Sequence, residues 1–169
     1  MKTKLNQSKL KLAIVSATLL GTAAITAPTY ATTADMDVTA SINVACTIAT
    51  VNLAFGAYDP IITNATDPLT KMASVTSTCT VGASGSILLG NGQNYTEESG
   101  RRMVHAADTQ SFLEYSVSNA SYGGADWSDV TMEGTGSAVE EAVYGQVGAG
   151  QNTAVDGSYS DLIVATVTY

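Results

Sequence analysis

Short runs that alternate between apolar and polar residues dominate the chain after its first thirty or so positions. Val, Ile, Thr and Tyr are enriched in these runs, whereas Gly, Asn, Asp and Ser collect between them. A period of two puts every second side chain on one face, so each run predicts a strand. Many short strands punctuated by turn residues predict an all-β antiparallel sandwich. The candidate strands are 34–44, 46–55, 72–81, 85–89, 102–106, 111–118, 142–147 and 159–169.

The segment 132–141 ("MEGTGSAVEE") is ambiguous and fits either a loop or one helical turn. Elsewhere the alternation predicts core positions. In the run after the first cysteine, apolar residues at every second position would lie on one face of a strand, and the same holds for the final run. These residues are Val51, Leu53 and Phe55, and Ile163, Ala165, Val167 and Tyr169.

The first 31 residues have the layout of a secretory signal peptide. Four lysines open the chain, an apolar run extends from Leu12 to about Ala27, and small residues at Thr29 and Ala31 bracket Tyr30. The apolar run is interrupted by Gly21 and is short for a membrane-spanning helix. We therefore expect export, with cleavage after Ala31, and no membrane insertion of the mature chain.

The chain that remains after cleavage is strongly acidic. Only three basic residues, Lys71, Arg101 and Arg102, oppose all fifteen acidic residues, which gives a net charge of −12. Such a chain repels nucleic acid and anionic lipid, so binding through a basic patch is excluded. About 138 residues are enough for one domain with a single core.

Two cysteines, Cys46 and Cys79, fall in the exported part of the chain. In an oxidising compartment a pair of cysteines predicts a disulfide. The alternatives are two free thiols or a metal pair, but neither a Cys-x-x-Cys spacing nor a nearby histidine supports a metal site.

The stretch "ADMDVTASINV", residues 34–44, has the most regular alternation near the new N-terminus. Its apolar positions would line one face of a strand, with Asp35 and Asp37 on the other. From alternation alone, this strand could fold back into its own sheet or pair with a sheet elsewhere. The apolar positions are Ala34, Met36, Val38, Ala40, Ile42 and Val44.

The end of the chain raises a related question. The opening of the 159–169 run is apolar on both faces, as in a strand covered on each side, and the sequence stops at Tyr169. Counting from Cys46, about six runs are convincing, whereas an immunoglobulin-type sandwich needs seven strands. An unpaired edge and an open apolar cleft are therefore expected beside the final strand.

Several motifs together resemble the spore coat U-type domain of archaic chaperone–usher pilus subunits. They are "DVTASINVACTI", "NLAFGAY", the cysteine-bearing strand "SVTSTCTV", and the closing pattern Gly-x-Tyr-x-Asp with an apolar strand in "GSYSDLIVATVTY". The resemblance covers the whole mature chain. It implies an incomplete immunoglobulin-like fold that lacks its last strand and is completed by a donor strand from a neighbouring subunit.

The resemblance also implies partners and roles. A periplasmic chaperone would lend a strand during export, and an outer-membrane usher would assemble identical or homologous subunits into an extracellular fibre. Residues 32–44 would be the donor-strand extension and 45–169 the pilin domain. The acceptor groove would be lined by Val51, Leu53, Phe55, Ile163, Ala165, Val167 and Tyr169.

Residues that could carry chemistry do not converge on a catalytic set. His105 is the only histidine and no nucleophile motif accompanies it, so a surface or loop histidine is expected. The pair Arg101–Arg102 is expected in a solvated loop, or as a salt-bridge site for a neighbour's acids. In the closing motif, Tyr159 and Asp161 predict a structural corner. We expect no enzyme activity, no metal and no cofactor.

The sequence thus predicts a structural subunit of a surface pilus that serves adhesion or biofilm formation. The alternative is a glycan-binding adhesin, or tip module of the same fibre type, that uses the 119–131 loop. Trp127, with Tyr122 nearby, is the aromatic residue that such a loop would offer a sugar. Packing of Trp127 over the end of the sandwich is the competing interpretation.

Overall fold

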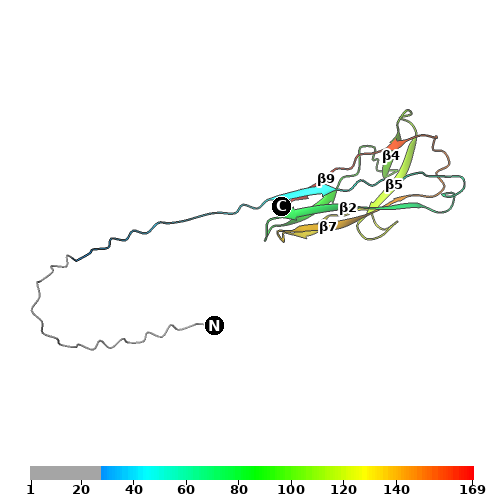
Figure 1. Ribbon diagram of the computed structural model, residues 1–169. Helices are drawn as coiled ribbons and strands as arrows, with labels where there is room; N and C mark the ends of the chain where they lie inside the picture. Colours follow the sequence, from blue (N-terminus) through cyan, green and yellow to red (C-terminus); the bar gives the residue numbers. More distant parts are fainter. Residues whose placement is uncertain (1–27) are drawn as a thin grey trace, which may run out of the picture. The chain divides into compact units, whose positions relative to one another are not determined.

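The computed structural model describes residues 28–169, so the predicted signal peptide, residues 1–31, lies almost entirely outside the described part. Residues up to Thr39 and Ala40–Tyr169 form two separate units, and every strand belongs to the second (Figure 1). Within the described residues, no helix has the length and apolar character needed to cross a membrane.

The second unit is built from antiparallel strands in two sheets. One sheet has six strands in the order β1-β2-β7-β5-β4-β8, and the other has three in the order β6-β3-β9. The all-β antiparallel sandwich predicted from the sequence is confirmed. The strands are β1 (Cys46–Thr50), β2 (Leu69–Cys79), β3 (Ser84–Leu89), β4 (Arg101–His105), β5 (Phe112–Ser118), β6 (Val130–Glu133), β7 (Ala138–Val147), β8 (Tyr159–Ser160) and β9 (Ala165–Thr168).

The core lies between the two sheets and follows the alternation of the sequence. In β2 the buried side chains include Ala73, Val75, Ser77 and Cys79, and β2 pairs with β7 along nearly its whole length. β3 contributes Ile87, which is fully buried, from the opposite sheet. Period-two burial of this kind fixes the register, because a shift by one residue would turn the apolar set outward.

The strand predicted over 46–55 is shorter than expected, because β1 ends at Thr50. The inward-facing side chains are at even-numbered positions before this point and at odd-numbered positions after it. Cys46 and Ile48 are half-buried, whereas further along the odd-numbered Leu53 and Phe55 turn inward. A regular strand cannot change the face of its inward side chains, so the chain must leave the sheet edge between these positions.

Gly145 of β7 explains where the departing segment goes. Leu53 and Phe55 pack directly over this glycine, and a Cβ there would come within 2.5 Å of Leu53 Cδ2 and 3.0 Å of Phe55 Cζ. Segment 51–58 therefore crosses from the edge of the larger sheet onto its inner face, and the missing side chain of Gly145 makes the close approach possible.

The run predicted over 159–169 is interrupted in the same manner. β8 pairs with β4 in the larger sheet, whereas β9 pairs with β3 in the smaller one. Residues 161–164 carry the chain from one sheet to the other. The 132–141 segment is neither a loop nor a helical turn throughout, since β6 covers its first residues and β7 begins at Ala138.

The N-terminal segment, residues 34–44, contains no strand, contrary to its regular alternation. Its large apolar side chains are highly exposed, with Met36, Val38 and Ile42 at 86 to 89%. The segment therefore does not fold back as a first strand of the described chain. An alternating sequence becomes a strand only when a neighbouring backbone accepts its hydrogen bonds, and no such partner pairs with it here.

Candidate functional site

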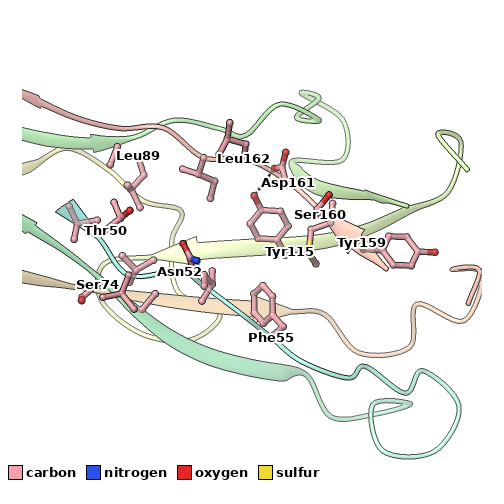
Figure 2. A pocket seen from close by; sticks show the side chains of 18 residues that line it. Thr50, Asn52, Phe55, Ser74, Leu89, Tyr115, Tyr159, Ser160, Asp161 and Leu162 are labelled. Atoms are coloured by element: carbon pink, nitrogen blue, oxygen red, sulfur yellow. Dashed lines mark hydrogen bonds between the residues drawn. The ribbon is translucent and has the colours of Figure 1, made fainter. Parts of the chain in front are cut away.

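An open groove runs between the two crossover segments of the sandwich. One wall is the end of β1 with residues 51–60, and the other is residues 154–163 leading into β9. The groove comprises a cavity of about 460 Å³ and a second of about 630 Å³. Leu53, Phe55, Met103 and Tyr159 line both cavities, so the two adjoin one another. Figure 2 shows the side chains that line the first cavity.

The groove follows sheet edges that have no strand partner. β1 pairs with β2 on one side only, and β9 pairs with β3 on one side only. Among the described residues, no strand pairs with the other edge of either one. β1 and β9 belong to different sheets and contact each other. The groove is lined by the segments next to them, where the chain leaves the larger sheet after Thr50 and where it enters the smaller sheet before Ala165. An unpaired edge beside an apolar cleft can accept another strand.

Five of the seven residues predicted to line an acceptor groove line the cavity nearer β1. Leu53, Phe55, Ile163 and Ala165 line the cavity nearer β1, and Val51 lines it while remaining largely exposed. Two predicted residues do not line either cavity. Val167 is half-buried and packs against the core, and Tyr169 is exposed beyond the end of β9.

Asp161, which the closing motif assigned with Tyr159 to a structural corner, also lines the groove and is the centre of a hydrogen-bonded group that the sequence did not predict. Asp161 lies in the crossover before β9, and its Oδ2 accepts a hydrogen bond of 2.7 Å from the Tyr115 hydroxyl. Its Oδ1 accepts from the Gln93 backbone N–H at 2.9 Å and from Asn94 Nδ2 at 3.0 Å. Figure 2 shows Tyr115 directed at Asp161 within the groove lining. The carboxylate thus joins three segments that are far apart in the sequence.

A glycine next to the Asp161 carboxylate and the protonation state of Tyr115 both support this hydrogen-bonded group. Gly92 has φ of +91°, and a side chain there would collide with the Asp161 carboxylate, so the 91–94 loop closes tightly around it. Burial raises the pKa of Tyr115 well above its usual range, and the hydrogen bond to Asp161 raises it further. Tyr115 therefore stays protonated and remains a donor to the carboxylate.

Tyr159 occupies the corner predicted from the closing motif. Its hydroxyl donates to the Val155 carbonyl at 2.7 Å and lies 2.8 Å from Ser111 Oγ. The ring lies edge-on to His105, with centroids 5.1 Å apart. Because the Tyr159 hydroxyl ties the side chain back to the carbonyl four residues earlier, Tyr159 fixes the wall of the groove just before the chain crosses between sheets.

The two cysteines form a disulfide across the first two strands. Cys46 and Cys79 are direct partners in the β1–β2 ladder, and their Cα atoms are 4.1 Å apart. The bond ties the start of β1, one edge of the open groove, to the end of the longest strand.

The expectation of a surface histidine is wrong. His105 is buried in β4, and its Nδ1 accepts the backbone N–H groups of Ala107 and Asp108 at 3.2 and 2.8 Å. Its Nε2 lies 3.1 Å from the Asp156 carbonyl oxygen, which accepts a hydrogen bond from the Nε2–H of the tautomer whose Nδ1 is an acceptor. Both ring nitrogens therefore bind backbone groups, and the histidine holds the 105–108 turn against the groove wall.

The expectation of a solvated arginine loop is also wrong. Arg101 and Arg102 lie in β4, and Arg101 is buried with an ion pair of 3.4 Å to Asp126. The guanidinium of Arg102 lies 4.0 Å above the centre of the Phe112 ring. A strand alternates its faces, so the adjacent arginines point to opposite sides of the sheet.

Trp127 is not available to a ligand. It is 6% exposed, its backbone N–H donates to Val117 O, and its indole Nε1 lies 3.4 Å from Ile87 O. The packing interpretation of Trp127 is therefore correct, and the 119–131 loop retains only Tyr122 as an exposed aromatic residue. Within residues 28–169, no cluster of three His, Cys, Asp or Glu side chains could hold a metal ion.

The fold and the groove together define a class of β-sandwich domain in which two sheet edges border an unfilled apolar groove. The chain belongs to the Spore Coat Protein U domain family, which it matches over residues 32–166. It is also similar to Protein U of Myxococcus xanthus, with 32% identity over 180 residues that cover 98% of this chain and 100% of that protein. The predicted resemblance to the spore coat U-type domain is confirmed.

A solved structure shares the fold. It is the crystal structure of the CsuC–CsuE chaperone–tip adhesion subunit pre-assembly complex from archaic chaperone–usher Csu pili of Acinetobacter baumannii. The match has a TM-score of 0.54 and 17% identity, and it covers 76% of this chain. The present chain spans only 40% of the matched chain, and the similarity supports the immunoglobulin-like sandwich predicted from the sequence.

Proposed function

We propose that this protein is a structural, non-enzymatic subunit of a surface pilus that polymerises head to tail by donor-strand exchange. The N-terminal segment of one subunit fills the open groove of the next. The observation that carries the proposal is that one chain has both an unpaired, alternating apolar segment and a groove bordered by unpaired sheet edges. The segment supplies apolar side chains and backbone hydrogen-bonding groups, and the groove offers an apolar surface and unpaired strand edges that could accept them.

The energetics of such an exchange are favourable. A strand entering the groove adds backbone hydrogen bonds along its edges while alternate side chains enter the apolar floor. Met36, Val38, Ile42 and Val44 are exposed in the described chain. Burying them contributes about 6–12 kcal/mol before the cost of ordering the segment. The contact joins different surfaces of two copies without closing on itself, so it produces a filament.

The proposal includes a route to the cell surface. Residues 1–31 act as the export signal, 32–44 as the donor extension and 45–169 as the pilin domain. An empty apolar groove would aggregate in transit, so a periplasmic chaperone covers it and an outer-membrane usher replaces the chaperone with the next subunit. The solved relative is a chaperone–subunit complex of an archaic chaperone–usher pilus, which supports this assignment. The finished fibre serves adhesion or biofilm formation.

The alternative function, a glycan-binding adhesin or tip module, is less well supported. Its main aromatic candidate, Trp127, is buried. Glycan binding by the monomer at useful affinity would restore this alternative.

Two variants test the proposal. The first deletes residues 32–44, and the second fuses another copy of 34–44 behind Tyr169 through a short flexible linker. We expect the deletion to yield a monomer of low stability that does not polymerise, because the groove has no donor. We expect the fusion to yield a stable monomer with a much higher melting temperature, because it fills its own groove. Calorimetry and electron microscopy measure both outcomes.

A matched control separates the donor strand from the linker. The same fusion with Val38 and Ile42 of the added copy changed to Asp should gain no stability, since charged side chains cannot enter the apolar groove. Fibres formed by the deletion variant, or equal melting temperatures for the fusion and its control, would refute donor-strand exchange.

A further inference from the structure

The turn at one end of the open groove exposes two neighbouring isoleucines. Ile61 is 69% and Ile62 is 80% exposed. They follow Pro60, which lines the groove beside Tyr58, so they lie where the groove leaves the domain. We call this the far end of the groove. Adjacent large aliphatic side chains held in solvent are unusual enough to indicate a contact surface.

The turn is held rigidly in this exposed state. The Asp59 carboxylate accepts the backbone N–H groups of Ile61 and Ile62, each at 3.0 Å, and these bonds lower the pKa of Asp59. The buried Asn64 side chain accepts from the Asp59 N–H at 3.1 Å and donates to the Asp67 carbonyl at 3.0 Å. The isoleucines thus do not fold inward over the groove, and little order remains to be gained when a partner covers them.

A second exposed apolar residue lies at the opposite end of the domain. Ala45, which directly follows the N-terminal segment, donates its backbone N–H to Thr80 Oγ1 at 3.1 Å, and its carbonyl accepts the Thr80 backbone N–H at 2.9 Å. The next residue, Val81, is 74% exposed. Gly136 approaches it from the β6–β7 turn, where a Cβ would lie 3.1 Å from Val81 Cγ2. We call this the root end, because the N-terminal segment enters the domain here.

Strand directions relate the two ends. β1 runs from the root end to Thr50 at the groove, and β9 runs back from Ala165, which lines the same cavity as Thr50. Every strand pair among residues 28–169 is antiparallel. A donor strand that pairs with β9 in the same manner runs parallel to β1, with residue 34 near the root end and residue 44 at the far end.

The geometry points to a second contact between subunits, which rests on the proposed function. Only Ala45 separates the last donor residue, Val44, from Cys46 at the start of β1. The root end of the incoming subunit must therefore follow the far end of the groove closely. We propose that the Ile61–Ile62 turn of one subunit packs against Val81 of the next copy of this chain. Because the mature chains repel one another by charge, an apolar contact suits this junction.

Cross-linking of the assembled fibre tests the contact. The Ile62→Cys/Val81→Cys double variant is polymerised with its natural disulfide intact and treated with a short bis-maleimide. We expect a ladder of covalent dimers, trimers and higher species on a denaturing gel. Each single variant should give no ladder, because its thiol has no partner on the neighbour. The matched control is Met72→Cys/Val81→Cys, since Met72 is 62% exposed in β2 away from the groove.

A non-covalent measurement supports the same test. In Ile61→Ser/Ile62→Ser fibres, we expect subunits to dissociate about tenfold faster than in the wild type. The affinity of this variant's groove for a synthetic 32–44 peptide should be unchanged, because neither isoleucine lines the groove. A loss of peptide affinity would show that the turn acts through the groove and would overturn the inference.

The outcomes separate the inference from the function on which it rests. Fibres that form normally but give no ladder, or that give the same ladder with Met72→Cys/Val81→Cys, overturn the second contact alone. If fibres form without residues 32–44, donor-strand exchange fails and the inference fails with it.

Discussion

At the level of single residues, Asp161 has the most connections around the groove. Its carboxylate accepts hydrogen bonds from Tyr115 on the floor and from Gln93 and Asn94 in a neighbouring loop. The crossover of the chain from the larger to the smaller sheet occurs at this residue. A carboxylate with three donors holds the backbone there more firmly than apolar packing would.

Replacing Tyr115 with Phe tests this anchor. The change removes one hydrogen bond to the carboxylate and keeps the ring, which lies edge-on to Phe55 with centroids 6.2 Å apart. We expect the free energy of unfolding to fall by about 1–3 kcal/mol, measured by urea denaturation. Tyr95→Phe is the control, because Tyr95 is exposed, and it should change stability by less than about 0.5 kcal/mol. Equal effects for the two variants would contradict the anchoring role.

Gly145 offers a second test at this scale. Gly145→Ala places a methyl group against Leu53 and Phe55, so we expect about 1–3 kcal/mol of destabilisation from overpacking. Gly148→Ala is the matched control, because a Cβ there meets its nearest neighbour, Gln151 Nε2, at 3.8 Å. Thermal unfolding of both variants measures the difference. If Gly145→Ala is as stable as Gly148→Ala, segment 51–58 has more freedom over β7 than its packing indicates.

Some residue environments could not be predicted from the sequence. His105 and Arg101 are polar residues beside Gly- and Ser-rich stretches, which favours exposure, yet both are buried. Their burial depends on backbone carbonyls supplied by other segments, Asp156 for His105 and Gly90 for Arg101. Trp127 differs from them, because packing over the end of the sandwich was one of its two predicted environments, and Val117 and Ile87 supply its backbone partners.

At the level of elements, alternation predicted the presence of the interior strands better than the points where the chain crosses between sheets. The interior runs correspond to β2, β3, β4, β5 and β7. The end of β1 at Thr50 and the break between β8 and β9 were missed. Both depend on close approaches that the local sequence does not encode, at Gly145 for one and at Gly92 for the other. The sequence named Asp161 only as part of a corner, so the hydrogen bonds of its carboxylate with Tyr115, Gln93 and Asn94 were not predicted.

The disulfide gives a prediction at the same scale. β1 is short and pairs only with β2, so the covalent bond is a large part of what holds it. The bond closes a loop of 33 residues, and Cys46→Ser/Cys79→Ser should lose about 3–4 kcal/mol of unfolding free energy. Calorimetry measures this loss. Reduced wild-type protein should show a similar decrease, and an unchanged melting temperature would mean that β1 is held by its neighbours alone.

At the level of the whole molecule, the proposed donor-strand exchange requires the even-numbered apolar face of the N-terminal segment to enter the groove of a neighbouring copy. Val38→Asp would place a charge among apolar side chains, so we expect polymerisation to be abolished. Asp37→Asn alters the opposite face and should leave assembly intact. Sedimentation and electron microscopy of both variants provide the readout. Normal fibres from Val38→Asp would mean that the segment binds in another register, with its odd-numbered residues inward.

The position of the disulfide has a mechanical consequence for a fibre built in this way. Tension along the fibre enters each domain through Ala45 and reaches Cys46 at once. The covalent bond passes that load to Cys79, at the end of the strand with the longest pairing in the sandwich, from Leu69 to Thr78 against β7. Pulling thus shears a long ladder, whose hydrogen bonds share the force, and does not peel β1 from its edge one bond at a time.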